Sequence, residues 1–145
     1  MPDHGDRRLR VIGPGRAGRS LAAALGHAGW AVAPILGRGD DPRSAAAGVD
    51  LLVLAVPDGA IAEVAAAVAP GEAVVAHLAG SHGLDVLEPH PRRASVHPLV
   101  SLPDADVGAR RLAAGAWFAV AGDPIAERVV ADLAGRAVVV PDDQR

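Results

Sequence analysis

One glycine-rich stretch constrains the fold of this chain more than any other feature. Residues 13–18 read Gly-Pro-Gly-Arg-Ala-Gly, which is a G-x-G-x-x-G spacing. The stretch follows a short apolar run at 9–12 and precedes a helix-forming segment at 21–28. A dinucleotide-binding motif requires this order of strand, tight turn and helix, whereas an isolated G-x-G-x-x-G is weak evidence. The alternative is a glycine-rich turn in an α/β protein that binds no ligand.

Each glycine of the motif has its own expected role. Gly13 permits the sharp turn out of the strand, Gly15 lets a pyrophosphate approach the backbone, and Gly18 lets the helix pack closely on the strand. The phosphates would then lie on the free N–H groups at the positive end of the helix. We therefore expect the cofactor to contact Gly13, Pro14, Gly15, Arg16, Ala17 and Gly18.

Composition excludes several function classes. The chain has 145 residues, enough for about one domain, and contains one Phe and no Tyr, so its core must be aliphatic. It has no Cys, and all fourteen basic residues are Arg, which excludes a thiol nucleophile, a Schiff-base lysine and a lysine-bearing phosphate loop. The net charge of −3 and the absence of a long apolar run indicate neither a nucleic-acid partner nor a membrane partner. We expect a cytoplasmic protein.

Alternating apolar runs and helical periodicities predict an α/β fold with a doubly wound, mostly parallel sheet. The expected strands are 8–12, 31–36, 50–56, 73–77, 93–96, 116–121 and 137–140. The expected helices are 16–28, 42–47, 60–68, 84–87 and 125–134, with 104–115 as a loop containing a helical turn. Gly29 is expected to end the first helix, and Asp58 to cap the N-terminus of the helix at 60–68.

Ligands of such sheets bind beyond the carboxyl ends of the strands. Most of the polar, glycine and histidine residues that interrupt the apolar pattern follow strand ends. These segments are 13–18, 37–38, 56–58, 77–81 and 97–99. We therefore expect them to meet at one edge of the sheet.

The residues after the second strand bear on the choice of cofactor. An NAD site has Asp or Glu about 20 residues past the glycine motif, on the ribose hydroxyls. Here Leu36 and Gly37 are followed by Arg38, whose guanidinium suits a 2′-phosphate. This favours NADP over NAD, with Arg38 a solvated loop charge as the alternative. NAD stays possible because Asp40 or Asp41 lies only a little further on.

The histidines are candidates for proton chemistry rather than for metal binding. Their spacing does not match a zinc site, and the chain offers no thiolate, so we expect no metal. His77 and His97 follow strand ends, where either could donate a proton or orient a carbonyl or imine. Ser81 and Ser101 could hydrogen-bond substrate or ribose. For each histidine the alternative is a strand-end side chain satisfied by backbone hydrogen bonds.

Four motifs in order carry a resemblance to a known family. They are Val-Ile-Gly-Pro-Gly-Arg-Ala-Gly at 11–18, Leu-Ala-Val-Pro-Asp-Gly-Ala-Ile at 54–61, His-Leu-Ala-Gly-Ser at 77–81 and Ser-Val-His-Pro-Leu at 95–99. The chain resembles the Rossmann-like DUF2520 oxidoreductases, which are related to pyrroline-5-carboxylate reductase and to the 6-phosphogluconate and β-hydroxyacid dehydrogenases. The resemblance implies an NAD(P)-binding Rossmann fold in which Val56 and Pro57 line the cofactor. It also implies that segments 79–81 and 97–99, including Ala79, Gly80 and Ser81, approach the nicotinamide.

The resemblance also implies a domain organisation. Residues 1–8 would be a flexible tail, 9–141 the NAD(P)-binding domain, and 142–145 the start of a linker to a helical C-terminal domain that this chain lacks. With that domain present, the family resemblance allows a homodimer. We expect a domain that passes hydride between NADP and a small carbonyl or imine substrate, with His97, His77 and Ser81 as catalytic candidates. The alternative is a non-catalytic dinucleotide-binding or sensory domain.

Overall fold

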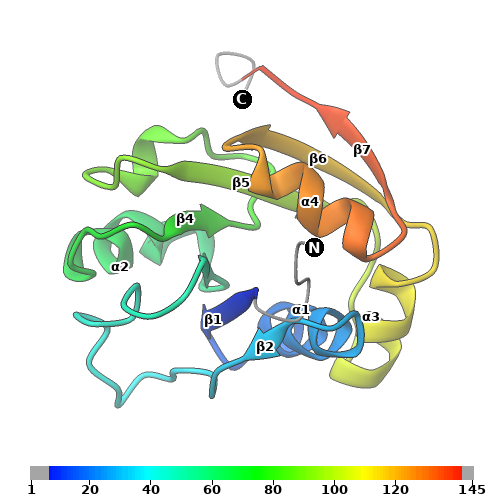
Figure 1. Cartoon of the computed structure of the whole chain (residues 1–145), viewed down its shortest axis with the longest axis horizontal. Helices are drawn as coiled ribbons and strands as arrows, with labels where there is room; N and C mark the ends of the chain where they lie inside the picture. Colours follow the sequence, from blue (N-terminus) through cyan, green and yellow to red (C-terminus); the bar gives the residue numbers. More distant parts are fainter. Residues whose placement is uncertain (1–6, 142–145) are drawn as a thin grey trace.

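The computed structural model describes residues 7–141, in which seven strands form one sheet. The strands lie in the order β2-β1-β3-β4-β5-β6-β7 (Figure 1). They are β1 Arg8–Ile12, β2 Ala31–Val32, β3 Leu51–Leu54, β4 Val74–His77, β5 Arg93–Pro98, β6 Trp117–Gly122 and β7 Arg136–Val139. Only the β5–β6 pair is antiparallel within this part of the chain. The expected doubly wound, mostly parallel sheet is confirmed.

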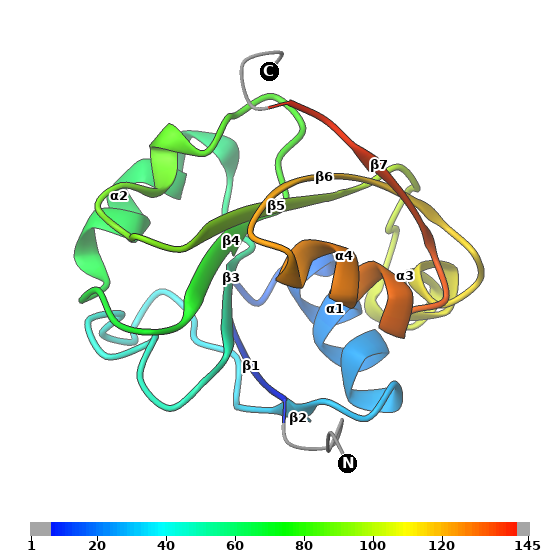
Figure 2. The ribbon, with the colours of Figure 1, turned by 45° about the horizontal axis from the view of Figure 1, so that its top comes forward.

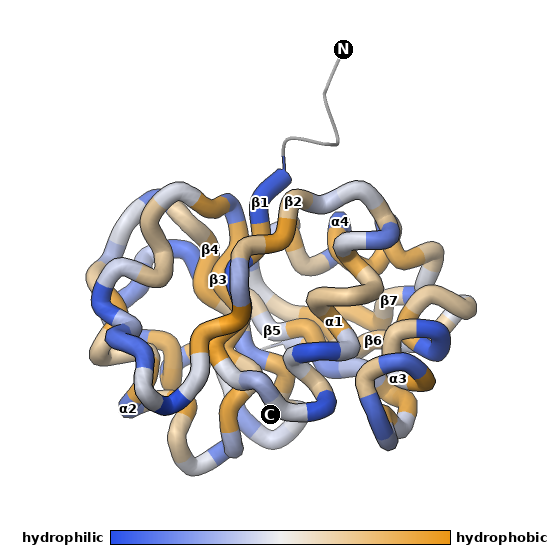
Figure 3. Tube along the Cα trace, turned by 90° about the horizontal axis from the view of Figure 1, so that it is seen from below, coloured by the Kyte–Doolittle hydropathy of each residue, from blue (hydrophilic) through white to orange (hydrophobic). Residues whose placement is uncertain are grey.

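Helices cover both faces of the sheet (Figure 2). One face packs against α1 Arg16–His27, α3 Ala105–Leu112 and α4 Ile125–Asp132. The other packs against α2 Ile61–Ala67, the 3₁₀ turn η3 Asp85–Leu87 and the turns at 43–48. A further 3₁₀ turn, η2 Asp58–Ala60, leads into α2. Figure 3 shows apolar segments along the strands and hydrophilic segments on the outer surface of α3.

Strand β3 shows why a continuous apolar run predicts a central parallel strand. All four of its residues are buried. Because successive side chains point to opposite faces, Leu51 and Val53 enter the core under α1, while Leu52 and Leu54 enter the core under α2. A strand covered on both faces has no polar side to present. The same reasoning applies to β4, whose four residues are all buried.

Most predicted elements are confirmed to within two residues at each end. The predicted second strand is an exception, since β2 contains only Ala31 and Val32, and Leu36 joins the sheet through an isolated bridge to Ile12. Pro34 lies between them and has no N–H to donate to a ladder. Gly29 has a φ of +104° directly after the C-cap of α1, which confirms its expected role.

The predicted helix at 42–47 is wrong. Residues 43–48 form turns, and the Arg10 guanidinium donates to the carbonyl oxygens of Ala45 and Ala47 at 2.6 and 2.9 Å. Gly48 has a φ of +74°, outside the helical region. The Ala45 N–H donates to the Pro42 carbonyl and the Ala47 N–H to the Ser44 carbonyl, each three residues back, so the segment forms successive turns that Arg10 holds against the sheet.

The predicted loop at 104–115 is wrong in the opposite sense, because it contains the eight-residue helix α3. The Asp104 carboxylate accepts a hydrogen bond from the Val107 N–H at 2.8 Å and caps the helix. Gly108 lies against Ser20 of α1, where a Cβ would collide with the Ser20 hydroxyl. Glycine lowers intrinsic helix propensity but lets the two helices approach closely, so packing overrides propensity here.

The two predicted terminal segments lie mostly outside the described residues. Of the predicted tail at 1–8, residues 1–6 lie outside the described residues, and Arg8 begins β1. The predicted linker at 142–145 also lies outside them. Between residues 7 and 141, no helix combines the length and the apolar character that crossing a membrane would require.

Candidate functional site

The strand directions bring the predicted segments to one edge of the sheet. Strands β1, β3, β4 and β5 are parallel, so the segments that follow them all leave from the same edge. The order reverses at β1, because β2 lies on one side of it and β3 on the other. This reversal is the position at which open α/β sheets bind ligands. We call this side of the sheet the carboxyl edge.

Packing explains two of the three motif glycines. Gly13 has a φ of +118°, and a Cβ there would collide with the carbonyl oxygen of Ala55. A Cβ on Gly18 would collide with the carbonyl oxygen of Gly13 and would lie 3.1 Å from Cγ1 of Val11. These two glycines therefore allow the turn and the close approach of α1 to β1, with or without a ligand.

Gly15 differs from the other two, because the fold does not require a glycine at this position. Its φ and ψ of −76° and −171° are open to any residue, and a Cβ would have no atom within 4 Å. Gly15 is the N-cap of α1, and no side chain caps this helix. The space in front of the first turn of α1 is therefore open, and Gly15 leaves it wide enough for a ligand to reach the backbone.

The loop after β2 lies beside the glycine loop. Leu36 bridges the two, since its N–H donates to Val11 and its carbonyl accepts from Gly13, both at 2.9 Å. A Cβ on Gly37 would lie 3.7 Å from Cγ of Pro14. Arg38 is exposed at this point, and the structure gives its guanidinium no hydrogen bond or ion pair with any residue of 7–141. Its charge is free to meet a ligand at the glycine loop.

Both acids that could have served NAD bind their own loop instead. The Asp40 carboxylate accepts from the Gly37 N–H at 2.7 Å, and the Asp41 carboxylate accepts from the Arg43 N–H at 3.0 Å. Such bonds stabilise turns of this kind. Of the other arginines near the motif, Arg16 is exposed, and the Arg19 Nε donates to the Pro14 carbonyl at 2.6 Å.

His77 lies at the end of β4 but is fully buried. Its Nδ1 accepts from the Ala79 N–H at 3.0 Å, and its Nε2 donates to the Gly83 carbonyl at 2.9 Å. Because both ring nitrogens are bonded to backbone, the geometry favours the structural alternative for this residue. The ring shapes the loop that carries Ala79 and Gly80.

His97 is half-buried near the end of β5 and packs on the loop after β4. Its Nδ1 lies 3.0 Å from the Leu78 carbonyl oxygen, and a Cβ on Gly80 would lie 2.7 Å from its Nε2. Gly80 thus makes room for the ring. The structure therefore brings two predicted site residues, Gly80 and His97, into contact.

Ser81 pairs with a residue whose role was mispredicted. Its hydroxyl donates to the Asp58 carboxylate at 3.2 Å. Asp58 lies inside η2 and caps neither η2 nor α2 with its side chain, so its expected N-cap role is wrong. The sequence did contain a signal for this pairing, because the segments that carry Asp58 and Ser81 follow neighbouring strands.

The remaining predicted residues lie in two places. Val56 and Pro57 lie in the same segment as Asp58. Ser101 lies beyond β5, where its carbonyl accepts from Arg111.

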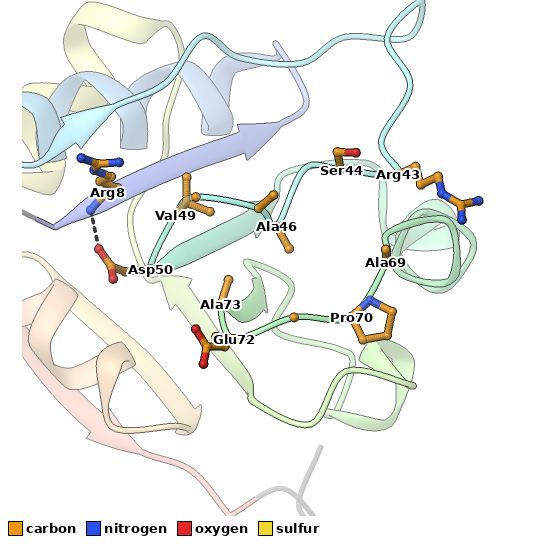
Figure 4. A pocket seen from close by; sticks show the side chains of 13 residues that line it. Arg8, Arg43, Ser44, Ala46, Val49, Asp50, Ala69, Pro70, Glu72 and Ala73 are labelled. Carbon is orange, nitrogen blue, oxygen red and sulfur yellow. Dashed lines mark hydrogen bonds between the residues drawn. The ribbon is translucent and has the colours of Figure 1, made fainter.

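Cavities in the described part of the chain lie away from this site or beside it rather than at it. A cavity of about 760 Å³ lies at the amino ends of β1, β3 and β4, beside Arg8, Asp50 and Ala73 (Figure 4). Its arginine side chains, Arg8 and Arg43, point away from its centre (Figure 4). A cavity of about 550 Å³ lies nearer the motif, between Pro14, Arg19 and residues 32–35. The glycine loop itself faces open space rather than an enclosed pocket.

Comparison with known proteins agrees with this geometry. A family model described as a Rossmann-like domain matches residues 40–103. No curated protein matches the sequence at a significant level. Among solved structures, a Bacteroides fragilis protein assigned as an NADP oxidoreductase has a TM-score of 0.78 at 17% identity, covering 97% of this chain and 62% of that one.

Two further solved structures contain a bound nicotinamide cofactor. Prephenate dehydrogenase from A. aeolicus, in complex with NAD+, has a TM-score of 0.75 at 15% identity and covers 95% of this chain and 61% of that one. Pyrroline carboxylate reductase from Plasmodium falciparum, with NADP bound, has a TM-score of 0.68 at 13% identity and covers 97% and 60%. The chain spans about six tenths of the length of these structures.

The fold is a Rossmann fold. Its strand order, its glycine turn between β1 and α1 and its likeness to these structures agree on this point. In a Rossmann fold the carboxyl edge at the reversal of strand order holds the dinucleotide. The residues gathered there are therefore the candidate site of this chain.

Proposed function

We propose that this chain is the NADP-binding domain of an oxidoreductase that transfers hydride between the cofactor and a small carbonyl or imine substrate. The observation that carries the proposal is Gly15. The fold accounts for Gly13 and Gly18 but does not require a glycine at position 15, and Gly15 lies at the uncapped first turn of α1, where a ligand that approaches the backbone would need the space that a glycine leaves. The solved structures described above, which include an NADP and an NAD+ complex, support the cofactor class.

The cofactor would lie along the carboxyl edge from β2 to β5. The pyrophosphate would rest on the uncapped first turn of α1, where N–H groups and the helix dipole favour negative charge. Arg38 would bind the 2′-phosphate, since it is exposed beside the glycine loop while Asp40 and Asp41 are bonded within their own loop. This arrangement supports NADP as the preferred cofactor.

The nicotinamide would then lie over the segments that follow β3, β4 and β5. Val56, Pro57, Ala79 and Gly80 would line it. His97 is the best-placed group for proton transfer, because its Nδ1 is held by a backbone carbonyl while its ring is only half-buried. Bound NADP supplies the hydride, and the protein contributes position and electrostatics.

Calorimetric titration of the 145-residue chain with NADPH and with NADH tests the proposal. We expect NADPH to bind more tightly at a fixed salt concentration. Gly15→Val should abolish binding of both cofactors, because the new side chain would occupy the pyrophosphate position. Gly71→Val is the matched control: Gly71 also has no neighbour within 4 Å but lies at the opposite edge of the sheet.

The outcomes separate clearly. Loss of binding in Gly15→Val with normal binding in Gly71→Val supports a dinucleotide site at the glycine loop. Equal affinities in all three proteins would remove the cofactor from this loop. Tighter binding of NADH than of NADPH by the original chain would contradict the role given to Arg38 and leave the dinucleotide site in place.

A further inference from the structure

Three side chains at the nicotinamide end of the carboxyl edge form a cluster, and each of them can accept a hydrogen bond. They are Asp58 after β3, Ser81 after β4 and His97 near the end of β5, and we call them the acceptor cluster. The Ser81 hydroxyl donates to the Asp58 carboxylate at 3.2 Å, and both side chains are exposed. The Ser81 oxygen therefore has only lone pairs left to offer, and the Asp58 carboxylate can only accept.

The tautomer of His97 adds a third acceptor. The Leu78 carbonyl oxygen cannot donate, so the His97 Nδ1 at 3.0 Å must carry the proton of this bond. In the neutral ring the other nitrogen, Nε2, then has a free lone pair. Because Nε2 lies against Gly80, the residue before Ser81, the imidazole and the serine oxygen belong to the same small region.

Charge is distributed unevenly along the carboxyl edge. The half near α1 carries the exposed guanidinium groups of Arg16 and Arg38 and the nearby Arg19. In the segments 55–60, 78–82 and 97–99 at the other half, Asp58 has the only formal charge when histidine is neutral. Within residues 7–141, no ion pair engages Asp58. The formal charge of the substrate end is therefore negative; His82 in the same segment carries a ring N–H, so the acceptors at this end are the side chains of Asp58, Ser81 and His97.

We propose that the acceptor cluster recognises a cationic nitrogen that carries N–H groups, such as a protonated amine, on the substrate. The inference rests on the proposed function for the placement of the substrate beside the nicotinamide. A donor-rich cation would satisfy Asp58, Ser81 and His97 together, whereas a carboxylate or phosphate would meet lone pairs and a like charge. Asp58 is the residue that determines this specificity.

The test titrates three small five-membered rings into the chain, with and without saturating NADP+, and follows binding by NMR shift perturbation. Pyrrolidine is protonated at neutral pH, tetrahydrofuran has the same ring with neither charge nor N–H, and cyclopentanecarboxylate is an anion. We expect pyrrolidinium alone to bind and to shift the amide signals of residues 58, 81 and 97. Asp58→Asn should weaken pyrrolidinium binding by about fivefold, the upper range for an exposed ion pair.

Asp106→Asn is the matched control, because Asp106 is an exposed acid on α3 and the substitution changes the net charge equally. Its pyrrolidinium affinity should stay within the error of the original chain. Equal affinity in Asp58→Asn and the original chain, or binding of the carboxylate as tight as that of pyrrolidinium, would overturn the inference. So would an equal loss of NADP+ affinity in Asp58→Asn, since the cluster would then serve the cofactor's carboxamide.

Failure of the proposed function gives a different result. If the chain binds neither NADPH nor NADH, the cofactor site is wrong. The titrations without cofactor then decide the inference by themselves. Asp58-dependent binding of pyrrolidinium supports the acceptor cluster, and no binding overturns it.

Discussion

Replacing Arg38 by Ala tests the choice between NADP and NAD directly. The guanidinium is exposed beside the glycine loop and has no partner among the described residues, so its removal leaves no buried group unpaired. The fold should therefore be unchanged, and the effect should appear only in ligand binding. Any change in affinity then reports the contact with the cofactor.

The expected magnitude follows from the setting of the arginine. A hydrogen bond to a charged group contributes about 1.5–3 kcal/mol net. Because Arg38 is exposed, solvent and salt screen the contact, and we take about 1.5 kcal/mol, or roughly tenfold in Kd. NADH has no 2′-phosphate, so its Kd should change by less than about twofold.

The assay is calorimetric titration of the original chain and of Arg38→Ala with both cofactors, at low and at moderate salt. The loss of NADPH affinity should be smaller at higher salt. Arg128→Ala is the control, because Arg128 is exposed on α4, away from the carboxyl edge, and its removal changes the net charge equally. Equal losses for NADPH and NADH, or an equal effect in the control, would refute the assignment of the 2′-phosphate to Arg38.

Two further predictions concern the neighbourhood of the site. Gly80→Ala should displace the His97 ring, since the new Cβ would lie 2.7 Å from Nε2, and a changed ring resonance of His97 in the NMR spectrum would show it; an unchanged resonance would mean that the ring does not pack there. Asp104→Ala should lower the free energy of unfolding by about 1 kcal/mol, because the Val107 N–H loses its capping partner. Urea denaturation measures this change, and Asp106→Ala, an acid in the first turn of the same helix that does not cap it, should change stability less; equal losses would contradict the cap.

Local sequence patterns predicted the elements whose causes are local. The apolar run of β3 predicts a buried strand because both faces of that strand need apolar side chains. The φ of +104° at Gly29 suits the end of α1, and its identity as glycine allows that end to be predicted. The glycine turn after β1 is predictable from the spacing of its glycines, although the close approach of Ala55 to Gly13 is visible only in the fold.

Prediction failed where a distant residue decides the local structure. The turns at 43–48 are held to the sheet by Arg10, whose guanidinium donates to the carbonyl oxygens of Ala45 and Ala47 from a strand more than thirty residues earlier. Helix α3 depends on the close contact of Gly108 with Ser20, although glycine argues against a helix by propensity. Neither partner is near in sequence, although the Asp104 cap of α3 is a local signal that a window along the chain does contain.

The candidate site divides in the same way. The sequence by itself predicted the glycine turn and Arg38 as one end of the candidate site, because the glycine spacing and Arg38 lie within about thirty residues of one another in a single β-α-β unit. Only the tertiary structure decided the arrangement of the segments after β3, β4 and β5. Three features arise because β3, β4 and β5 are neighbours in the sheet. They are the burial of both nitrogens of His77, the contact of His97 with Gly80 and the pairing of Ser81 with Asp58. Strand order is a property of the whole chain, and it brings together side chains that no local pattern connects.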